Sequence, residues 1–353
     1  MKKIFSVFLA VLMVFTLFGC SKAKEEETTT AAATTAVTTT ETTTSPYVKG
    51  GNPLSGYSKF KKSAVGKRPV AIVVENLSPA RPQWSIGSAD IIMEGEVEGG
   101  ISRMLWIYAD YTSVPEKVGP LRSARPSYVK FAKLFDAVFI HWGGSHSKSG
   151  YIGGYSTIER LKVDNIDGQN GGALFGRDHT RSTSIEHRGT LNGNYIESAI
   201  ANKGYRTKKN KKATTFTFNI KNKKVGSTAA NNVGIAFSSI TDTRRFTYST
   251  KDRKYHTNDW NTDVSFKNLI VLKDSSTYIT TPYKGGSTTY LNYDYKGGSG
   301  YLISQGTSTE IKWDTEGGKL NLHTADGKTL ALNIGKSYIA FSSTNNGGRV
   351  AIS

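Results

Sequence analysis

The sequence predicts an α+β fold, with a mixed α/β N-terminal domain over residues 51–205 and a mostly antiparallel β domain over residues 206–353. A change of pattern along the chain indicates this division. Before about residue 205, β-branched runs alternate with helix-like segments, and after about Thr214 strand-like runs follow one another between turn signals. About 300 residues follow the N-terminal segment, which is enough for two domains.

The N-terminal part reads as strands alternating with helices. Runs rich in β-branched residues predict strands at 68–76, 89–99 and 101–110. Pro126 predicts a helix start, because its missing N–H costs nothing at the first helical position. The apolar residues Tyr128, Phe131, Ala132 and Phe135 are spaced as one face of an amphipathic helix, so this face is expected to be buried. A short buried strand is expected within 136–145, and further helices around 157–161 and 193–203.

The C-terminal part reads as consecutive antiparallel strands. Alternating β-branched and aromatic residues recur between Tyr-Lys-Gly-Gly and Asp-Gly turn signals, at 268–279, 297–313 and 319–341. His256 and His323 stand alone there, and we expect a surface or core role for each.

The first 50 residues predict export and lipid anchoring. Lys2 and Lys3 precede an uncharged apolar run that is shorter than the roughly 20 residues of a transmembrane helix, so residues 1–19 read as a signal peptide. Leu17-Phe18-Gly19-Cys20 resembles the lipobox of bacterial lipoproteins, in which the cysteine thiol accepts a diacylglycerol. Residues 20–50 are then the lipidated Cys20 and a disordered Thr-rich tether, because Thr, Ala and Glu bury too little to offset ordering entropy. The expected location is the extracytoplasmic face of the cell membrane.

Composition limits the chemistry and the partners. Cys20 is the only cysteine, which excludes internal disulfides, a catalytic cysteine and thiolate metal sites from the folded part. Without Lys2 and Lys3 the chain keeps 44 basic and 28 acidic residues, a net charge of +16. Outside the membrane this charge favours anionic wall polymers or lipid headgroups. The expected partners are membrane lipid, through diacylglyceryl Cys20, and an anionic wall polymer or envelope protein. No specific nucleic acid, cofactor or metal is expected.

The stretch GPLRSAR (119–125) is the first candidate site. Arg122 and Arg125 flank Ser123 on the loop that enters the predicted helix, whose free N–H groups and dipole favour an anion. Guanidinium groups suit phosphate or carboxylate. The alternative is that both arginines pair across a strand with an acidic residue, Glu94, Glu96 or Glu98.

Two other loops carry polar residues. HWGGS places His141 at a strand end, before Gly143, Gly144 and Ser145, and a Gly-Gly turn lets a ligand approach the backbone. The second loop contributes Arg177, Asp178, Arg181 and His187. Polar groups at loop ends are where function tends to lie, although each residue alone has an ordinary structural explanation.

Nine motifs follow one another along the chain after the tether. They are NPLSG (52–56), RPVAIVVEN (68–76), ARPQ (80–83), ADIIMEGEVEGG (89–100), GPLRSAR (119–125), HWGGS (141–145) and GRDHTR (176–181), with GSGYLISQGTSTEIKW (298–313) and DGKTLALNIGKSYIAF (326–341) in the second domain. In order and rough spacing these motifs resemble those of the YerB-like bacterial lipoproteins. The resemblance implies a two-domain extracytoplasmic lipoprotein and implies no reaction.

Two hypotheses of function remain open at this point. In the first, a binding or scaffold lipoprotein holds an anionic group with Arg122, Arg125, Arg177 and Arg181. In the second, a hydrolase or transferase acts on envelope glycans or phosphodiesters, with His141 or His187 as general base and Asp178 or Glu98 as supporting carboxylate. Ser123 or Ser145 would be its nucleophile. A zinc site of His141, His187 and Asp178 has no supporting ligand spacing.

Overall fold

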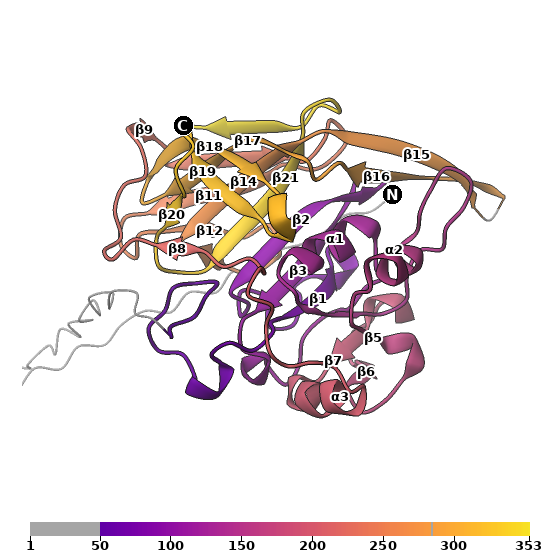
Figure 1. Ribbon diagram of the computed structural model, residues 1–353. Helices are drawn as coiled ribbons and strands as arrows, with labels where there is room; N and C mark the ends of the chain where they lie inside the picture. Colours follow the sequence, from indigo (N-terminus) through magenta and orange to yellow (C-terminus); the bar gives the residue numbers. More distant parts are fainter. Residues whose placement is uncertain (1–49, 284) are drawn as a thin grey trace, which may run out of the picture. The chain divides into compact units, whose positions relative to one another are not determined.

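The computed structural model describes residues 50–283 and 285–353, which belong to one compact unit (Figure 1). The predicted signal peptide, Cys20 and the tether up to residue 49 lie outside the described residues. Within the described residues, no helix has both the length and the apolar composition that crossing a membrane requires.

The N-terminal part contains the predicted strands and helices in the predicted order. Its elements are β1 (Val70–Glu75), β2 (Ile91–Glu98), β3 (Ile101–Tyr108), α1 (Pro126–Leu134), β4 (Val138–His141), α2 (Gly154–Leu161), β5 (Asn165–Asp167), β6 (Phe175–Arg177), β7 (Gly189–Leu191) and α3 (Ile196–Asn202). Arg125 is the N-cap of α1 and Pro126 its first residue, as the proline predicts.

The C-terminal part is built from strands. They are β8 (Thr217–Phe218), β9 (Thr228–Ala229), β10 (Asn232–Ala236), β11 (Arg244–Ser249), β12 (Lys254–Thr257), β13 (Val264–Phe266), β14 (Asn268–Asp274), β15 (Ser276–Tyr283), β16 (Gly286–Tyr293), β17 (Gly297–Ser304), β18 (Thr307–Asp314), β19 (Asn321–Thr324), β20 (Ala331–Leu332), β21 (Ser337–Ser343) and β22 (Arg349–Ile352). The α+β class with a mostly β C-terminal region is confirmed.

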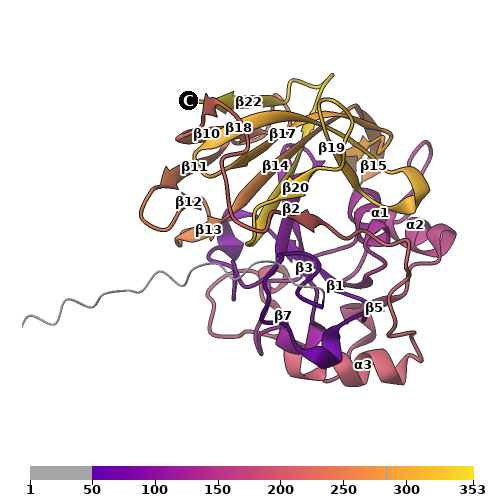
Figure 2. The ribbon, with the colours of Figure 1, turned by 60° about the vertical axis from the view of Figure 1, so that its left-hand side comes forward.

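One large sheet joins the two parts of the chain. Its main path among the described residues runs β19-β18-β17-β14-β21-β2-β3-β1-β4-β5, and β21 pairs in parallel with β2, so that Ile91 lies opposite Ser337. A second sheet, β13-β12-β11-β10-β22, comes wholly from the C-terminal part. Strands from both sides of the predicted boundary at residues 205/206 therefore share one sheet (Figures 1 and 2).

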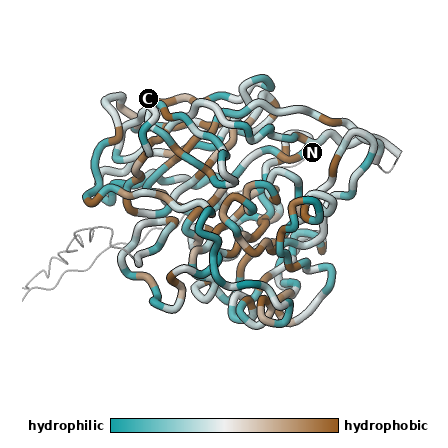
Figure 3. Tube along the Cα trace, viewed as in Figure 1, coloured by the Kyte–Doolittle hydropathy of each residue, from teal (hydrophilic) through white to brown (hydrophobic). Residues whose placement is uncertain are grey.

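Alternation along the strands places one hydrophobic core on each face of the large sheet. In β1, Ala71 and Val73 pack with residues of α1 and α2 in the first core. The alternate residues Val70, Ile72 and Val74 point to the opposite face and belong to the second core. The second core is closed by the smaller sheet and by α3. Figure 3 shows hydrophobic residues along the central strands and α1. This two-sided burial makes the sheet a rigid support for the loops at its edges.

Candidate functional site

The predicted site loops meet at the carboxyl ends of β1 and β4. These strands are parallel neighbours from Val70 to Ile72, and beyond that point residues 118–124 lie between them. The amide of Arg122 donates to the carbonyl of Val73 (3.0 Å), and its carbonyl accepts from the amide of Trp142 (3.0 Å). The carboxyl ends of parallel strands are where open α/β sheets commonly bind ligands.

The remaining loops attach to the same segment. The amide of Ala124 donates to the carbonyl of Gly143 (2.8 Å), and the amide of Leu121 donates to the carbonyl of Gly189 (2.8 Å). β6 and β7 form a hairpin that carries residues 178–188 between them. We call segments 118–125, 141–145 and 175–188 together the polar edge. The structure thus brings together the three loops that the sequence singles out.

Arg125 is engaged inside the protein. Its Nε donates to Glu98 (2.6 Å) and its Nη2 donates to the other carboxylate oxygen. Arg103 also contacts Glu98, at 3.3 Å. Burial alone would raise the pKa of Glu98, but the charges of Arg103 and Arg125 outweigh burial and lower it. For Arg125 this geometry agrees with the alternative of pairing with an acidic residue and does not support a role as ligand for an external anion. Arg122 pairs instead with Glu75 and Glu186, which were not among the three acidic candidates.

Glu94 is a fully buried structural carboxylate. It accepts hydrogen bonds from Arg244 Nε (2.9 Å), Asn76 Nδ2 (2.6 Å), Ser102 Oγ (2.6 Å) and the Tyr338 hydroxyl (2.9 Å). These partners come from both parts of the chain. The network joins β2 to β11 and β21, so Glu94 has no free oxygen with which to support a site on the polar edge.

His141 and the glycines after it also serve the fold. His141 is fully buried, and its ring nitrogens contact the carbonyl of Gly143 (2.7 Å) and the side chain of Asn165 (3.1 Å). The amide of Gly143 donates to Asp167 (2.7 Å), and a Cβ on Gly144 would meet the Tyr155 ring at 3.0 Å. The nitrogens of His141, which was predicted as a general base, contact other protein groups and not a substrate site. The backbone of the Gly-Gly turn, where a ligand was expected to approach, likewise lies against Asp167 and Tyr155.

The two candidate nucleophiles are hydrogen-bonded within the protein. Ser145 Oγ accepts from the amide of Gly154 (2.8 Å) and contacts the Tyr151 hydroxyl (2.9 Å). Ser123 Oγ donates to the carbonyl of Trp142 (3.1 Å). Neither hydroxyl contacts a histidine, which a nucleophile–base pair would need.

Arg122 and His187 converge on a buried carboxylate, Glu75. The Arg122 Nε and His187 Nδ1 atoms lie 3.1 Å and 2.9 Å from the same Glu75 oxygen. Glu75 is 2% exposed and His187 7% exposed. The other ring nitrogen of His187 lies 3.6 Å from the exposed Glu186. The contact places a carboxylate beside one imidazole nitrogen, but neither Glu75 Oε1 nor His187 Nδ1 makes a hydrogen bond there.

Unsatisfied polar atoms gather around this carboxylate. In the described part of the chain, ten buried side-chain polar atoms lack a hydrogen-bond partner, and six of them lie around the end of β1. They belong to Glu75, Arg81, Gln83, His187 and Arg188. Two of these atoms, Glu75 Oε1 and His187 Nδ1, belong to the ion pair described above and lack only hydrogen-bond geometry. The other four are buried polar atoms of a kind that is rarely left unpaired.

Arg177 and Arg181 are held differently, by aromatic stacking. The Arg177 guanidinium lies 4.4 Å from the centre of the Trp142 ring, and that of Arg181 lies 3.9 Å from the centre of the Trp84 ring. Arg181 also donates to the carbonyls of Ala80 and Pro82, both at 2.7 Å. Among the described residues neither arginine has a carboxylate within ion-pair distance, although the charges of Asp178 and Glu75 act on Arg181 from further away.

A shallow cavity of about 500 Å³ lies beside Arg177, and its lining also includes Lys117, Phe175 and Asp178. Asp178 pairs with Lys117 and accepts from the amide of Thr180 (2.7 Å). Hydrogen bonds from Lys117 and Thr180 hold the pKa of the Asp178 carboxyl well below its usual range. Asp178 therefore stays ionised and anchors the loop.

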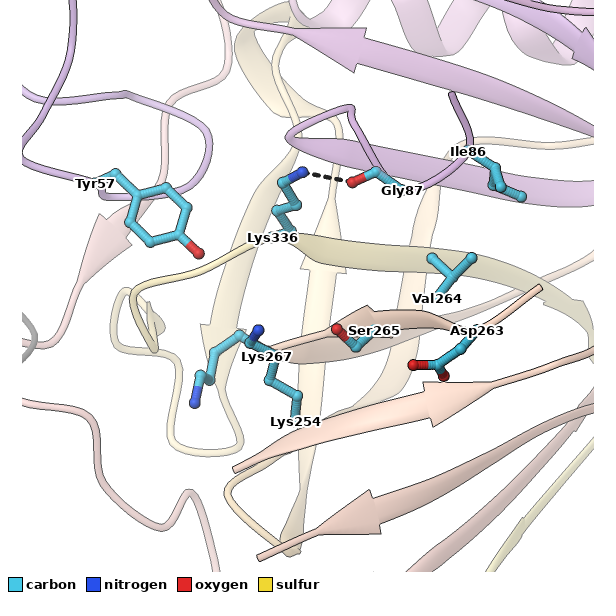
Figure 4. Close-up of a pocket in the computed structure, with 9 residues that line it drawn as sticks. All are labelled: Tyr57, Ile86, Gly87, Lys254, Asp263, Val264, Ser265, Lys267 and Lys336. Carbon is cyan, nitrogen blue, oxygen red and sulfur yellow. Dashed lines mark hydrogen bonds between the residues drawn. The ribbon is translucent and has the colours of Figure 1, made fainter. Parts of the chain in front are cut away.

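Another cavity, of about 260 Å³, contains lysines but no residue of the polar edge. It lies between Tyr57, Gly87 and the ends of β12 and β13, and it is lined by Lys254, Lys267 and Lys336 (Figure 4). Lys336 donates to the carbonyls of Gly87 and Ser88, and Lys267 donates to that of Arg253 (2.6 Å). Two of these ammonium groups thus hold loops together.

Sequence reasoning missed Glu75, Gln83, Trp84, Lys117 and Trp142. Glu75 and Gln83 lie within the motifs RPVAIVVEN and ARPQ, where an acid ending a strand of β-branched residues was an available signal. The described residues contain no group of three or more His, Cys, Asp or Glu side chains arranged to hold a metal ion.

Fold and site together define an α+β protein with a polar edge at the ends of its parallel strands. Residues 54–206 and 225–339 match the N-terminal and C-terminal domain models of a family described as "Protein of unknown function (DUF3048)". A curated relative, "Putative lipoprotein YerB" of Bacillus subtilis, is 29% identical over 298 residues, 81% of this chain and 84% of the relative. The crystal structure of the YerB protein from Bacillus subtilis matches with a TM-score of 0.68 at 27% identity, covering 86% of this chain and 100% of that one. The two domain matches together cover most of the chain, which therefore belongs to the DUF3048 family.

Proposed function

We propose that this chain is a membrane-anchored extracytoplasmic binding protein whose polar edge holds an anionic group of an envelope polymer through Arg177 and Arg181. One observation carries the proposal. These two guanidinium groups stack on Trp142 and Trp84 and have no carboxylate within ion-pair distance among the described residues, whereas Arg122 and Arg125 are paired with Glu75 and Glu98.

The chemistry of the two arginines supports an anionic ligand. Stacking fixes the planar guanidinium, so less conformational entropy is lost when its N–H groups bind phosphate or carboxylate. The cavity of about 500 Å³ beside Arg177 provides room for the group that carries the charge. Lipid anchoring through Cys20 would hold the polar edge near wall polymers.

The test is binding of purified anionic wall polymer by the full-length chain with Cys20→Ser, which cannot be acylated. We expect Arg177→Ala plus Arg181→Ala to weaken binding at least about tenfold, since two charge-assisted contacts are lost. Binding should also weaken with added salt. Lys203→Ala plus Lys212→Ala is the matched control, because it removes equal charge from exposed residues elsewhere. If both variants weakened polymer binding equally, binding would depend only on overall charge, and the proposed role of Arg177 and Arg181 would be wrong.

A second candidate function, hydrolysis or group transfer on envelope glycans or phosphodiesters, rests on the Glu75–His187 contact of 2.9 Å. His187 would be the general base and Glu75 the residue that orients it. Turnover of a wall-fragment panel should be lost in His187→Ala and reduced in Glu75→Gln, with polymer binding retained. A wild-type protein inert across that panel would leave binding as the function.

A further inference from the structure

A second cavity, separate from the polar edge, lies where α1 and α2 face the β15–β16 hairpin. Its volume is about 620 Å³, within the roughly 300–1,000 Å³ of typical small-molecule sites. α1 and α2 lie side by side in both ribbon views (Figures 1 and 2). We call this cavity the helix groove.

The walls of the helix groove are largely apolar. Leu134 of α1, Leu161 of α2 and Ile279 of β15 line it, together with the buried ring of Tyr295. Ile152, on the loop before α2, lines it while remaining 46% exposed. An exposed branched side chain at the opening of an apolar cavity leaves hydrophobic area that a ligand can cover.

Three cations surround these walls, namely Lys130, Lys133 and Arg160. Burial lowers the pKa of Lys130, and the positive charge of Arg160 lowers it further. The negative charges of Asp294 and Asp274 raise this pKa, but they do not outweigh burial. The side chains of Lys133 and Arg160 have no hydrogen-bond or ion-pair partner among the residues that the structure describes. An anion between them would supply the missing counter-charge.

One polar atom in the groove also lacks a partner. Asn292 of β16 lines the cavity, and its side-chain oxygen is buried without a hydrogen bond. Since the two ends of an amide can be exchanged by rotation, this group can either accept from or donate to a ligand. Apolar walls, unpaired cations and one free amide together suit a molecule with a hydrocarbon tail and an anionic head.

We infer that the helix groove binds a single-chain anionic amphiphile, with its tail against Leu134, Leu161 and Ile279 and its carboxylate or phosphate head between Lys133 and Arg160. The inference does not depend on the proposed function, because no residue of the groove belongs to the ligand set of the polar edge. An acidic peptide is the competing occupant, and the small size and apolar walls of the groove favour the amphiphile.

The test is a calorimetric titration of the full-length Cys20→Ser chain with dodecanoate below its micellar concentration. Dodecanoate should bind at one site, and each methylene removed from the tail should weaken binding about fourfold, from about 0.8 kcal/mol per buried CH₂. Dodecyltrimethylammonium, with the same tail and the opposite charge, should bind at least about tenfold more weakly. Equal binding of both amphiphiles, or no dependence on tail length, would overturn the inference.

Variants separate the groove from other surfaces. Lys133→Ala plus Arg160→Ala, at two exposed positions, should weaken dodecanoate binding at least about tenfold, and Ile152→Asp should weaken it further. Lys203→Ala plus Lys212→Ala and Arg177→Ala plus Arg181→Ala should leave it unchanged. A response of these last two pairs equal to that of Lys133 and Arg160 would contradict the assignment, as would tighter, competitive binding of a poly-glutamate peptide.

Discussion

Removing Glu98 should destabilise the protein more than removing Arg125, although each change breaks the same ion pair. The reason is that Glu98 lies between two cations. The Arg103 and Arg125 side chains are 5% and 13% exposed, and that of Glu98 is 14% exposed. Burial, together with the charge of Arg125, lowers the pKa of Arg103 to about 10, whereas the charge of Glu98 raises it. Glu98 therefore offsets the repulsion between the two guanidinium groups.

The expected magnitudes follow from what each variant leaves behind. Glu98→Gln leaves two buried cations facing each other, and stranding a buried charge typically costs about 3–5 kcal/mol. Arg125→Ala loses two charge-assisted hydrogen bonds, but Glu98 keeps Arg103 and the repulsion between the arginines disappears. We therefore expect a cost of about 2 kcal/mol for Arg125→Ala.

The assay is urea denaturation of the wild type and the two variants, with free energies of unfolding extrapolated to water. Glu98→Gln should be the less stable variant by at least about 1 kcal/mol. The reasoning is refuted if Arg125→Ala is equally or more destabilised. It is also refuted if both variants lie within about 0.5 kcal/mol of the wild type, the value expected of an exposed pair.

Three further predictions address the anchor, pH dependence and backbone. Cys20→Ala should release the protein into the soluble fraction, and the wild type should take up a palmitate analogue; a variant that stays membrane-bound, with both forms unlabelled, would contradict lipidation. Burial raises the pKa of Asp274 to about 6, so between about pH 4 and 6 this group binds more protons in the folded state than in the unfolded chain. Its contribution to the free energy of unfolding should therefore fall by about 2 kcal/mol as pH rises. In urea denaturation at about pH 4 and about pH 6, the difference between the wild type and Asp274→Asn should change by that amount, and an unchanged difference would contradict the assignment. Gly119→Ala should lower the free energy of unfolding, measured in urea, by roughly 2–4 kcal/mol. The reason is that φ at Gly119 is +140° and the new Cβ would lie 2.6 Å from the carbonyl oxygen of Gly189. Gly99→Ala is the control, because φ there is +54° and the new Cβ would meet open space, and it should lower the free energy of unfolding by about 1 kcal/mol.

Local structure around the candidate site was predictable from the sequence. Pro126 and the apolar spacing after it predict the start and the buried face of α1, and the β-branched runs predict β1, β2 and β3. Both signals depend on neighbours within a few residues, such as a missing N–H group or a repeat along one helix face. The α+β class followed from such signals alone.

Long-range pairing was not predictable in the same way. β2 pairs in parallel with β21, and Arg244 closes the Glu94 network from 150 positions away in sequence; no local pattern encodes either contact. The choice of Glu98 as the partner of Arg125 depends on a register shift between Glu96 and Glu98 in the β2–β3 pairing. The sequence could therefore name three acidic candidates and could not choose among them.

The central claim is that the arginines of the polar edge divide into structural and ligand-facing groups. The most direct measurement compares Arg177→Ala plus Arg181→Ala with Arg125→Ala, following wall-polymer affinity and free energy of unfolding in parallel. We predict that the first variant loses affinity at least about tenfold and about 2 kcal/mol of stability, because Arg181 gives up its hydrogen bonds to the carbonyls of Ala80 and Pro82. Arg125→Ala should lose a similar amount of stability and keep its affinity. The reverse pattern, with affinity lost in Arg125→Ala and retained in the other variant, would contradict the account.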